Sequence, residues 1–293
     1  MQCRKVSRRS LASALLVMLL LAPTVAFASC ECSPCNFGEA QPACGPNGTL
    51  AFVTRECRPP FGDIWGTLVA GPDFTFGSWG VLETPTWAPD GNRVAFGWGG
   101  AGIYILTHGQ PEPVLVPGSA FGDGAPTWSQ QGGTIAFGRD GEVWVMNDDG
   151  SSRRQITSLG DCWAPAISPD GTQIAFGYGN GLWVQALTPG ASPRRLTDGA
   201  RPAWAPNGKW IAFDSDRAGN LDVWVIAVNG GTAVRVTSGA DSESDPSWSR
   251  DGTNIVYTVT TPGCQCLEWV TTLPDYTVDV QPYTWSQVKG VYR

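Results

Sequence analysis

Histidine is nearly absent from the sequence, since the 293 residues include only His108, and charged residues make up just 15% of the chain. A metal site built from several histidines is therefore excluded. A Ser-His-acid triad would have to use His108. The sequence also contains no GxSxG, Walker or dinucleotide-binding motif. These absences argue against an enzyme and favour a binding or scaffold protein.

Long hydrophobic runs are absent beyond the start of the chain. Residues 1–10 carry four basic residues and no acid, an apolar run follows over 11–23, and Ala-Phe-Ala occupies 26–28. This is the pattern of a secretory signal peptide, residues 1–28, and it predicts a secreted or periplasmic protein that does not span a membrane. The "FAS" before Cys30 resembles a bacterial lipobox, so lipid anchoring at Cys30 is the alternative.

Basic residues are too few for a nucleic-acid-binding protein. Cleavage after Ala28 would remove four basic residues and no acid, and the formal net charge would change from −7 to −11. Nucleic-acid binding requires a basic surface. The charge instead favours solubility or a basic partner.

Glycine and proline are abundant, with 37 and 23 residues. They mark a segment that recurs six times, with turn glycines spaced 37 to 44 residues apart. The copies are PACGPNGTLAF (42–52), PTWAPDGNRVAF (85–96), PTWSQQGGTIAF (126–137), PAISPDGTQIAF (165–176), PAWAPNGKWIAF (202–213) and PSWSRDGTNIVY (246–257). Pro-Asp-Gly and Pro-Asn-Gly favour tight turns between two strands.

Two further short runs follow each copy. The first contains an aromatic residue and the second is clearest as RRQIT (153–157), RRLT (194–197) and VRVT (234–237). The aromatic residues are Trp65, Tyr104, Trp144, Trp183, Trp224 and Trp269. Four short strands, A to D, in each unit of about 40 residues are typical of a propeller blade. We therefore predict an all-β fold, a six-bladed β-propeller of four-stranded blades over 42–280, with the Trp of strand A and the aromatic of strand C packed between blades.

The repeat resembles that of the TolB-type propeller, the Pro-Asp relative of the WD repeat. The resemblance covers residues 42–280, with Cys44 and Ile167 at positions where other copies have Trp. It implies a propeller that binds a protein or peptide at the bacterial cell envelope. The tail over 281–293 contains PYTWSQ, which echoes PTWSQ at 126–130. This tail is either a ring-closing strand on the first blade or a surface extension.

Propeller topology places the D–A and B–C loops on one face, called here the candidate face. Acidic residues gather in the D–A loops or the equivalent entry segment: Glu39, Glu83, Asp123, Asp161, Asp198, Asp241 and Asp245. Aromatic residues predicted on the same face are Trp79, Trp98, Trp163 and Tyr178. The acids either attract a cation or basic partner or only cap turns. The aromatic rings either stack on sugars or cover the ends of the core.

Eight cysteines remain after signal cleavage, all at or near the candidate face: Cys30, Cys32, Cys35, Cys44, Cys57, Cys162, Cys264 and Cys266. An even count in an exported protein favours disulfides. We expect the segment 29–41 to be stapled to loops of the first and last blades. A metal site on CECSPC (30–35) is the alternative.

No cofactor is expected from the sequence, although two acidic runs offer oxygen ligands for calcium. The first contains Asp241, Glu243 and Asp245, and its spacing matches no complete EF-hand loop. The second is DSDRAGNLD (214–222), which lacks a terminal bidentate Glu and is also typical of a structural turn in TolB-like repeats.

Three functions remain open at this point. The first is a monomeric module that binds a protein or peptide through the candidate face. The second is a propeller that binds glycans, or cleaves them with a pair of carboxylates, which requires no histidine. The third is a structural repeat without a discrete ligand.

Intact mass of the exported protein, reduced and oxidised, tests the processing predictions. We expect loss of residues 1–28 and a mass difference of two hydrogens per disulfide between the two forms. A lipid on Cys30 would contradict cleavage after Ala28, and free thiols at most cysteines would contradict the disulfide prediction.

Overall fold

The computed structural model describes residues 36–45, 50–58, 63–70, 74–79, 81–188, 190–261 and 264–271. The predicted signal peptide, Cys30, Cys32, Cys35 and the tail 281–293 lie outside the described residues. Within the described residues, no helix has the length and apolar character needed to cross a bilayer.

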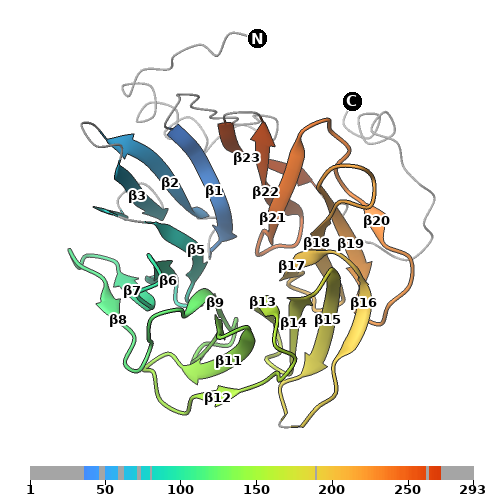
Figure 1. Cartoon of the computed structure of the whole chain (residues 1–293), viewed down its shortest axis with the longest axis horizontal. Helices are drawn as coiled ribbons and strands as arrows, with labels where there is room; N and C mark the ends of the chain where they lie inside the picture. Colours follow the sequence, from blue (N-terminus) through green and yellow to red (C-terminus); the bar gives the residue numbers. More distant parts are fainter. Residues whose placement is uncertain are drawn as a thin grey trace.

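The described residues form six antiparallel sheets in a ring, numbered here as blades one to six (Figure 1). Blade one contains β1 (Asn36–Cys44), β2 (Leu50–Arg58), β3 (Asp63–Ala70) and β4 (Thr75–Trp79). Blade two contains β5 (Leu82–Trp87), β6 (Arg93–Trp98), β7 (Ile103–Thr107) and β8 (Val114–Leu115). Blade three contains β9 (Gly124–Trp128), β10 (Thr134–Arg139), β11 (Glu142–Asn147) and β12 (Arg154–Gln155).

The second half of the ring repeats this order. Blade four contains β13 (Cys162–Ile167), β14 (Gln173–Tyr178), β15 (Gly181–Ala186) and β16 (Arg194–Asp198). Blade five contains β17 (Ala200–Trp204), β18 (Trp210–Ser215), β19 (Asp222–Ala227) and β20 (Val234–Arg235). Blade six contains β21 (Ser242–Trp248), β22 (Asn254–Thr261) and β23 (Cys264–Thr271), so it has three strands in the described part of the chain.

The predicted all-β propeller of four-stranded blades is confirmed as the fold class. Strands pair in chain order within every sheet, and the first strand of each sheet lies nearest the centre (Figure 1). The first blade begins at Asn36, inside the predicted segment 29–41. Its inner strand β1 lies beside β21, β22 and β23 of the last blade, which brings the two ends of the ring together.

The Pro-Asp-Gly repeat forms the predicted A–B turn. In blade two the amide of Gly91 donates to the carbonyl of Ala88 at 3.0 Å, and Gly91 has a φ of 68°. Asp90 Oδ1 accepts a hydrogen bond of 2.8 Å from the amide of Asn92. Glycine is favoured here because a positive φ carries no Cβ penalty.

Hydrophobic side chains pack between neighbouring blades, and the middle strands are buried on both faces. In β18, Ile211 and Phe213 pack toward blade four, whereas Ala212 between them packs toward blade six. The small Ala175 of blade four contacts the cluster that contains Trp204 and Phe213 of blade five. Small side chains on one blade thus pack against large side chains on the next blade, which gives dense packing at a constant distance between blades.

Five such clusters span blades one and two, two and three, three and four, four and five, and five and six. The strand-A tryptophans Trp87, Trp128, Trp204 and Trp248 are buried in them, as the sequence predicted. Tyr104, Trp144, Trp183 and Trp224 of the third strands are partly buried against the same clusters.

Truncation of a buried interblade ring should be costly. Phe213 is fully buried, so Phe213→Ala should lower the unfolding free energy by about 3–5 kcal/mol in chemical denaturation. Phe121 is 86% exposed and serves as the matched control. Phe121→Ala should change the unfolding free energy by less than about 0.5 kcal/mol. Similar effects of the two substitutions would contradict interblade packing as the main source of stability.

Candidate functional site

Two sets of backbone hydrogen bonds define the two faces of the ring. On the candidate face, the D–A loops donate to the B–C loops of the preceding blades, through Gly122 to Gly100 at 2.7 Å and Gly199 to Asn180 at 2.9 Å. On the opposite face, the C–D loops donate to the A–B turns, for example Leu187 to Thr172 at 2.8 Å. The pairing of loops predicted from the topology is therefore confirmed.

The inner strands share a bulge immediately before a proline. Proline cannot donate to the strand ladder, and an extra residue at this point interrupts the pairing. The register shifts in every inner strand at this position. The residue before the proline has a φ between 44° and 52° in five blades: Thr84, Ala125, Ala164, Arg201 and Asp245. A positive φ in a non-glycine residue costs about 1–3 kcal/mol, so the surrounding ring must hold these conformations in place.

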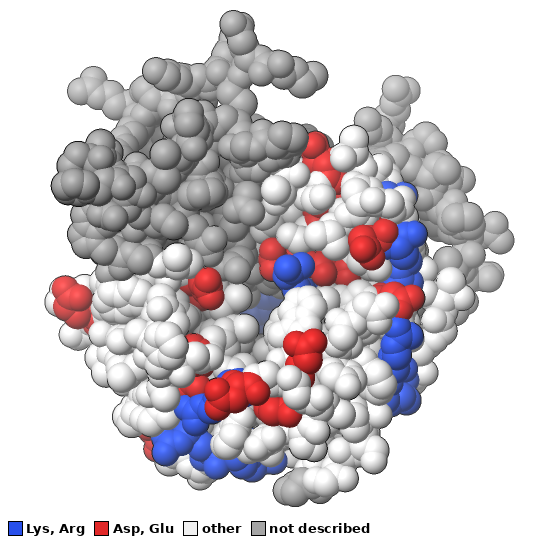
Figure 2. Space-filling view, viewed as in Figure 1, with Lys and Arg blue, Asp and Glu red and all other residues white. Residues whose placement is uncertain are grey.

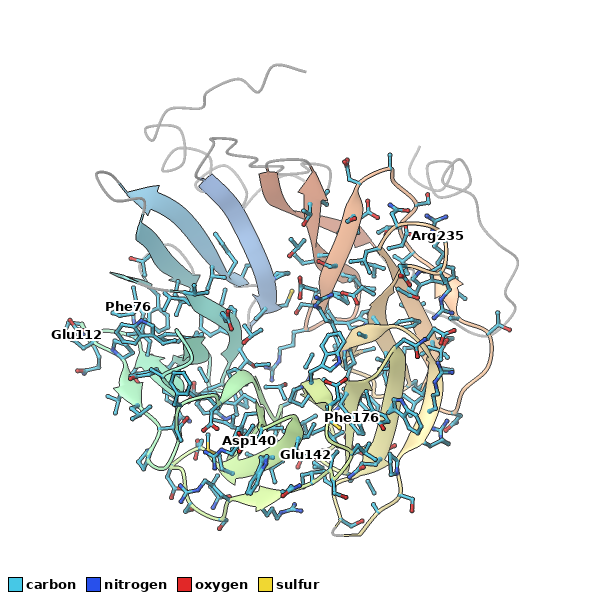
Figure 3. The ribbon with its side chains drawn as sticks, viewed as in Figure 1. Phe76, Glu112, Asp140, Glu142, Phe176 and Arg235 are labelled. Carbon is cyan, nitrogen blue, oxygen red and sulfur yellow. The ribbon has the colours of Figure 1, made fainter. Side chains whose placement is uncertain are left out.

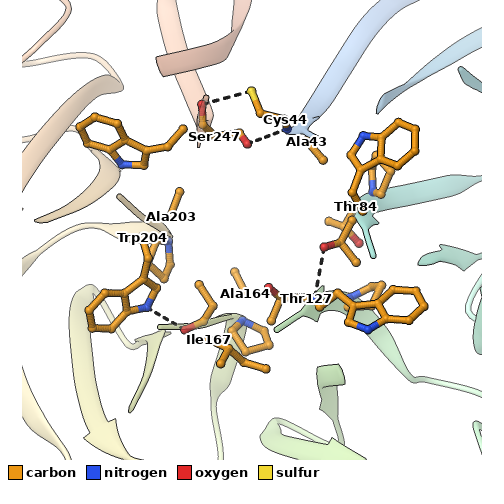
Figure 4. A pocket seen from close by; sticks show the side chains of 18 of the residues that line it. Ala43, Cys44, Thr84, Thr127, Ala164, Ile167, Ala203, Trp204 and Ser247 are labelled. Atoms are coloured by element: carbon orange, nitrogen blue, oxygen red, sulfur yellow. Dashed lines mark hydrogen bonds between the residues drawn. The ribbon is translucent and has the colours of Figure 1, made fainter. Parts of the chain in front are cut away.

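These bulges line the central channel, a cavity of about 430 Å³ on the axis of the ring. Figure 4 shows the inner strands of the blades surrounding it. Every blade contributes the proline of its bulge to the wall, and the turn prolines Pro89 and Pro206 line it as well; the bulge prolines are Pro42, Pro85, Pro126, Pro165, Pro202 and Pro246. Because proline lacks an N–H group, polar recognition in this wall depends on the side chains beside the prolines.

One charged cluster lies where the inner strands of blades four to six begin, at the candidate-face end of the channel. We call Trp163, Arg201, Asp214 and Asp245 the channel mouth. Arg201 Nη1 donates to Asp214 Oδ2 at 2.9 Å, and Arg201 Nε lies 3.3 Å from Asp245 Oδ1. The guanidinium carbon lies 5.4 Å from the ring centroid of Trp163. The amide of Asp245 donates to Asp214 Oδ2 at 3.2 Å, which ties blades five and six together.

Burial controls the protonation of this cluster. Burial and the charge of Asp245 raise the pKa of Asp214 to about 6 against the opposing charge of Arg201. Burial lowers the pKa of Arg201, but the charges of Asp214 and Asp245 outweigh it and leave that pKa raised. Arg201 therefore stays charged and links the two carboxylates.

The predicted acidic residues fall into different environments. Glu83, Asp161, Asp198 and Asp241 are exposed, and Asp198 forms an ion pair with Arg195. Asp123 differs from the expectation, because it is 2% exposed and accepts hydrogen bonds from Arg139 Nε at 2.5 Å and Ser119 Oγ at 2.9 Å. It anchors the D–A loop and offers no surface for a partner. Glu39 lies in β1, but its side chain is outside the described part.

Of the predicted aromatic residues, the structure places Trp163 at the channel. Trp98 packs edge-on against Tyr104 with a centroid separation of 4.9 Å, and Tyr178 packs against Trp183 at 5.7 Å. These two rings cover the ends of the interblade core. Trp79 ends β4, and its side chain is outside the described part.

The acidic runs do not converge into a cation site. Asp245 contacts Arg201, whereas Glu243 is buried beside Thr237. Asp214 and Asp222, at the ends of the second run, bind different arginines, since both oxygens of Asp222 accept from Arg235 at 2.7 Å. Among the described residues, no group of three or more His, Cys, Asp or Glu side chains could hold a metal ion.

Two cysteines have described side chains, and both are free thiols, which differs from the expected disulfides. Cys44 lies where blades one and six meet; its amide donates to Ser247 Oγ at 3.1 Å and its Sγ donates to Ser247 O at 3.8 Å. Burial raises the pKa of its thiol to about 11. Cys162 is buried between blades three and four. The other six cysteine side chains lie outside the described part, and their pairing stays a prediction.

Sequence reasoning missed Arg201 and the partner role of Asp214. The signal was present in the column immediately before the repeat proline, which reads Gln41, Thr84, Ala125, Ala164, Arg201 and Asp245. Only the last two members are charged. The residue type at this position varies between neutral and charged, although the following proline is present in every copy. This variation indicates a position that packing of the hydrophobic core does not constrain.

The ring of four-stranded sheets around a lined channel defines the protein as a β-propeller. A family model described as the TolB beta propeller domain matches residues 126–272, half of the chain. The chain therefore belongs to the TolB β-propeller domain family.

Individual relatives match shorter parts. The uncharacterized peptidase YuxL of Bacillus subtilis is 32% identical over 121 residues, 36% of this chain and 18% of that protein. The TolB homolog of Chlorobium luteolum is 32% identical over 123 residues, 40% of this chain and 28% of that protein. The chain thus matches less than a third of the length of either relative. The crystal structure of TolB from Acinetobacter baumannii has a TM-score of 0.60 at 21% identity, covering 75% of this chain and 61% of that one, and this likeness concerns the fold.

A second cluster, between blades five and six, joins Asp222, Arg235, Thr237 and Glu243. Thr237 Oγ1 donates to Glu243 Oε2 at 3.2 Å and accepts from the amide of Val223 at 2.9 Å. Burial raises the pKa of Glu243 to about 7, and the neighbouring Asp222 adds to the rise. Arg235 lies toward the outer side of the ring (Figure 3).

Stability should respond to the protonation of Glu243. A carboxyl with a higher pKa when folded binds its proton more tightly in the folded state, so its contribution to the unfolding free energy falls as pH rises from about 4.5 to about 7. Glu243→Gln keeps an acceptor for Thr237 without the charge. We therefore expect this variant to have a higher Tm than the wild type at pH 8, and a smaller difference at pH 4.5.

The control is Glu112→Gln, because Glu112 is exposed at the outer edge of the ring (Figure 3). It should leave the pH profile unchanged. A Glu243→Gln variant less stable than the wild type at pH 8 would show that this carboxyl is not strained by ionisation.

Proposed function

We propose that the protein is an exported TolB-like β-propeller that binds a protein or peptide segment at the bacterial cell envelope. The observation that carries this proposal is the channel mouth, where the partly exposed Trp163 and Arg201 stand at the entrance of a lined channel. Membership of the TolB propeller family and the secretory pattern of residues 1–28 support the envelope as its location.

The channel suits a narrow, extended ligand. Its wall combines prolines, alanines and tryptophans with polar side chains such as Thr127, Gln130 and Ser247, so shape and hydrogen bonds would together fix a ligand there. Its charged groups at the candidate-face end belong to Arg201 and Asp245. An extended segment entering there would bury apolar surface in the channel and meet polar partners at its entrance.

Binding without catalysis is part of the proposal. His108 lies in the C–D loop of blade two on the opposite face, and its ring packs edge-on against Phe74 at 5.5 Å. The carboxylates of the channel mouth are both engaged by Arg201. Among the predicted aromatic side chains that the structure describes, Trp163 is the one left for the glycan alternative, since Trp98 and Tyr178 belong to the core.

Selection from a displayed peptide library on the immobilised exported protein tests the proposal. We expect selected peptides to lose about tenfold in affinity with Trp163→Ala, about 1.4 kcal/mol. Trp144→Ala is the matched control, because Trp144 is also partly buried and stacked by an arginine, Arg139 at 5.4 Å, but does not line the channel.

Trp144→Ala should leave the affinity within about twofold of the wild type, a change of less than 0.5 kcal/mol. Equal losses in both variants would move the binding site away from the channel mouth. Retrieval of no peptide, together with Trp163-dependent binding on a glycan array, would replace the peptide proposal with the glycan alternative.

A further inference from the structure

We infer that the channel mouth receives a positively charged group of the ligand, a primary ammonium or a guanidinium, beside Asp245 and Asp214. This inference rests on the proposed function and specifies the chemistry of the segment bound: a lysine or arginine side chain, or a free amino terminus. The juxtaposition that carries it is two carboxylates sharing one guanidinium at the entrance of the channel.

The charge count at the channel mouth is unbalanced. Arg201 provides one positive charge, whereas Asp214 and Asp245 provide two negative charges within hydrogen-bond or ion-pair distance of it. The equivalent positions Thr84, Ala125 and Ala164 of blades two, three and four are neutral. One side of the entrance therefore carries a local excess of negative charge.

Asp214 lacks a counter-charge of its own. Its side chain is only 2% exposed, and its hydrogen bonds from Arg201 Nη1 and the amide of Asp245 both fall on Oδ2. A buried carboxylate is stable when it is fully paired, and here the pairing charge is divided with Asp245. Burial, together with the charge of Asp245, is also what raises the pKa of Asp214. A second cation at the mouth would remove this imbalance.

Arg201 is poorly placed to receive an anion instead. Its Nη1 and Nε edges face Asp214 and Asp245, and its plane lies near the ring of Trp163. An approaching carboxylate would meet Asp245, whose side chain is 24% exposed, inside the same cluster. A cation would meet that carboxylate favourably.

The surface around the channel mouth is also negatively charged. Exposed acidic residues on the candidate face include Glu83, Asp140, Asp161 and Asp241. Figure 2 shows acidic side chains around the central opening, while most basic side chains lie nearer the outer edge. Such a distribution concentrates cations at the opening and accelerates their association.

Two short peptide mixtures, identical except for lysine or glutamate at the central residue, test the inference in binding titrations with the full exported chain. We expect the lysine mixture to bind about tenfold more tightly. Asp245→Asn should abolish most of this preference, while Arg201→Gln should strengthen lysine binding, because it removes the competing guanidinium. A site for anions would give the opposite sign for both variants.

The matched control is Asp140→Asn. Asp140 is an exposed acid on the same face with the same φ of 52° as Asp245, but it does not line the channel. Asparagine tolerates this conformation, so both variants should fold. Asp140→Asn should leave the lysine preference within about twofold of the wild type.

The outcomes separate the two proposals. If the wild type binds both mixtures equally, or prefers glutamate, the inference is wrong while peptide binding in the channel stands. If the wild type binds neither mixture, both the inference and the proposed function are overturned. If Asp140→Asn reduces the preference as much as Asp245→Asn, the preference arises from the general field of the face, and the assignment to the channel mouth is wrong.

Discussion

The structure depends on one packing constraint: small side chains on one blade must lie against large side chains on the next blade. Ala212 and Ala175 in the second strands leave room for the ring or branched side chain of the next blade. Hydrogen bonds join the strands within a blade, whereas blades are joined to one another by side-chain packing together with a few hydrogen bonds between blades. This packing holds the inner strands around the axis and keeps the five strained pre-proline residues in place.

The fold could be predicted from the sequence because each repeat contains both the residues of the A–B turn and the buried residues of the core strand. Pro-Asp-Gly at 89–91 gave the A–B turn, and "IAF" gave a strand buried on both faces, since each residue's role depends on its own blade and its immediate neighbours. Loop positions on the two faces followed from topology. The beginning of β1 at Asn36 was missed, because the first copy has Cys44 where four other copies have the tryptophan of the inner strand.

The site was less predictable for a physical reason. An acid in a D–A loop can face solvent, as Asp161 does, or turn inward to an arginine from another strand, as Asp123 does toward Arg139. That choice depends on contacts 16 residues or more apart in the chain. Trp163 was correctly placed near the candidate face, whereas the role of Asp214 depends on contacts with Arg201 in the neighbouring strand and with Asp245 in the next blade.

The side chains at the pre-proline bulge line the channel, whereas other side chains, those of the interblade clusters, stabilise the ring. At that one position the blades tolerate threonine, alanine, arginine and aspartate, all with nearly the same backbone angle and none within the interblade clusters. A change of side chain there alters the chemistry of the channel at little cost to the core. Ligand preference in such a ring can therefore diverge one blade at a time, by single substitutions, while the scaffold is inherited intact.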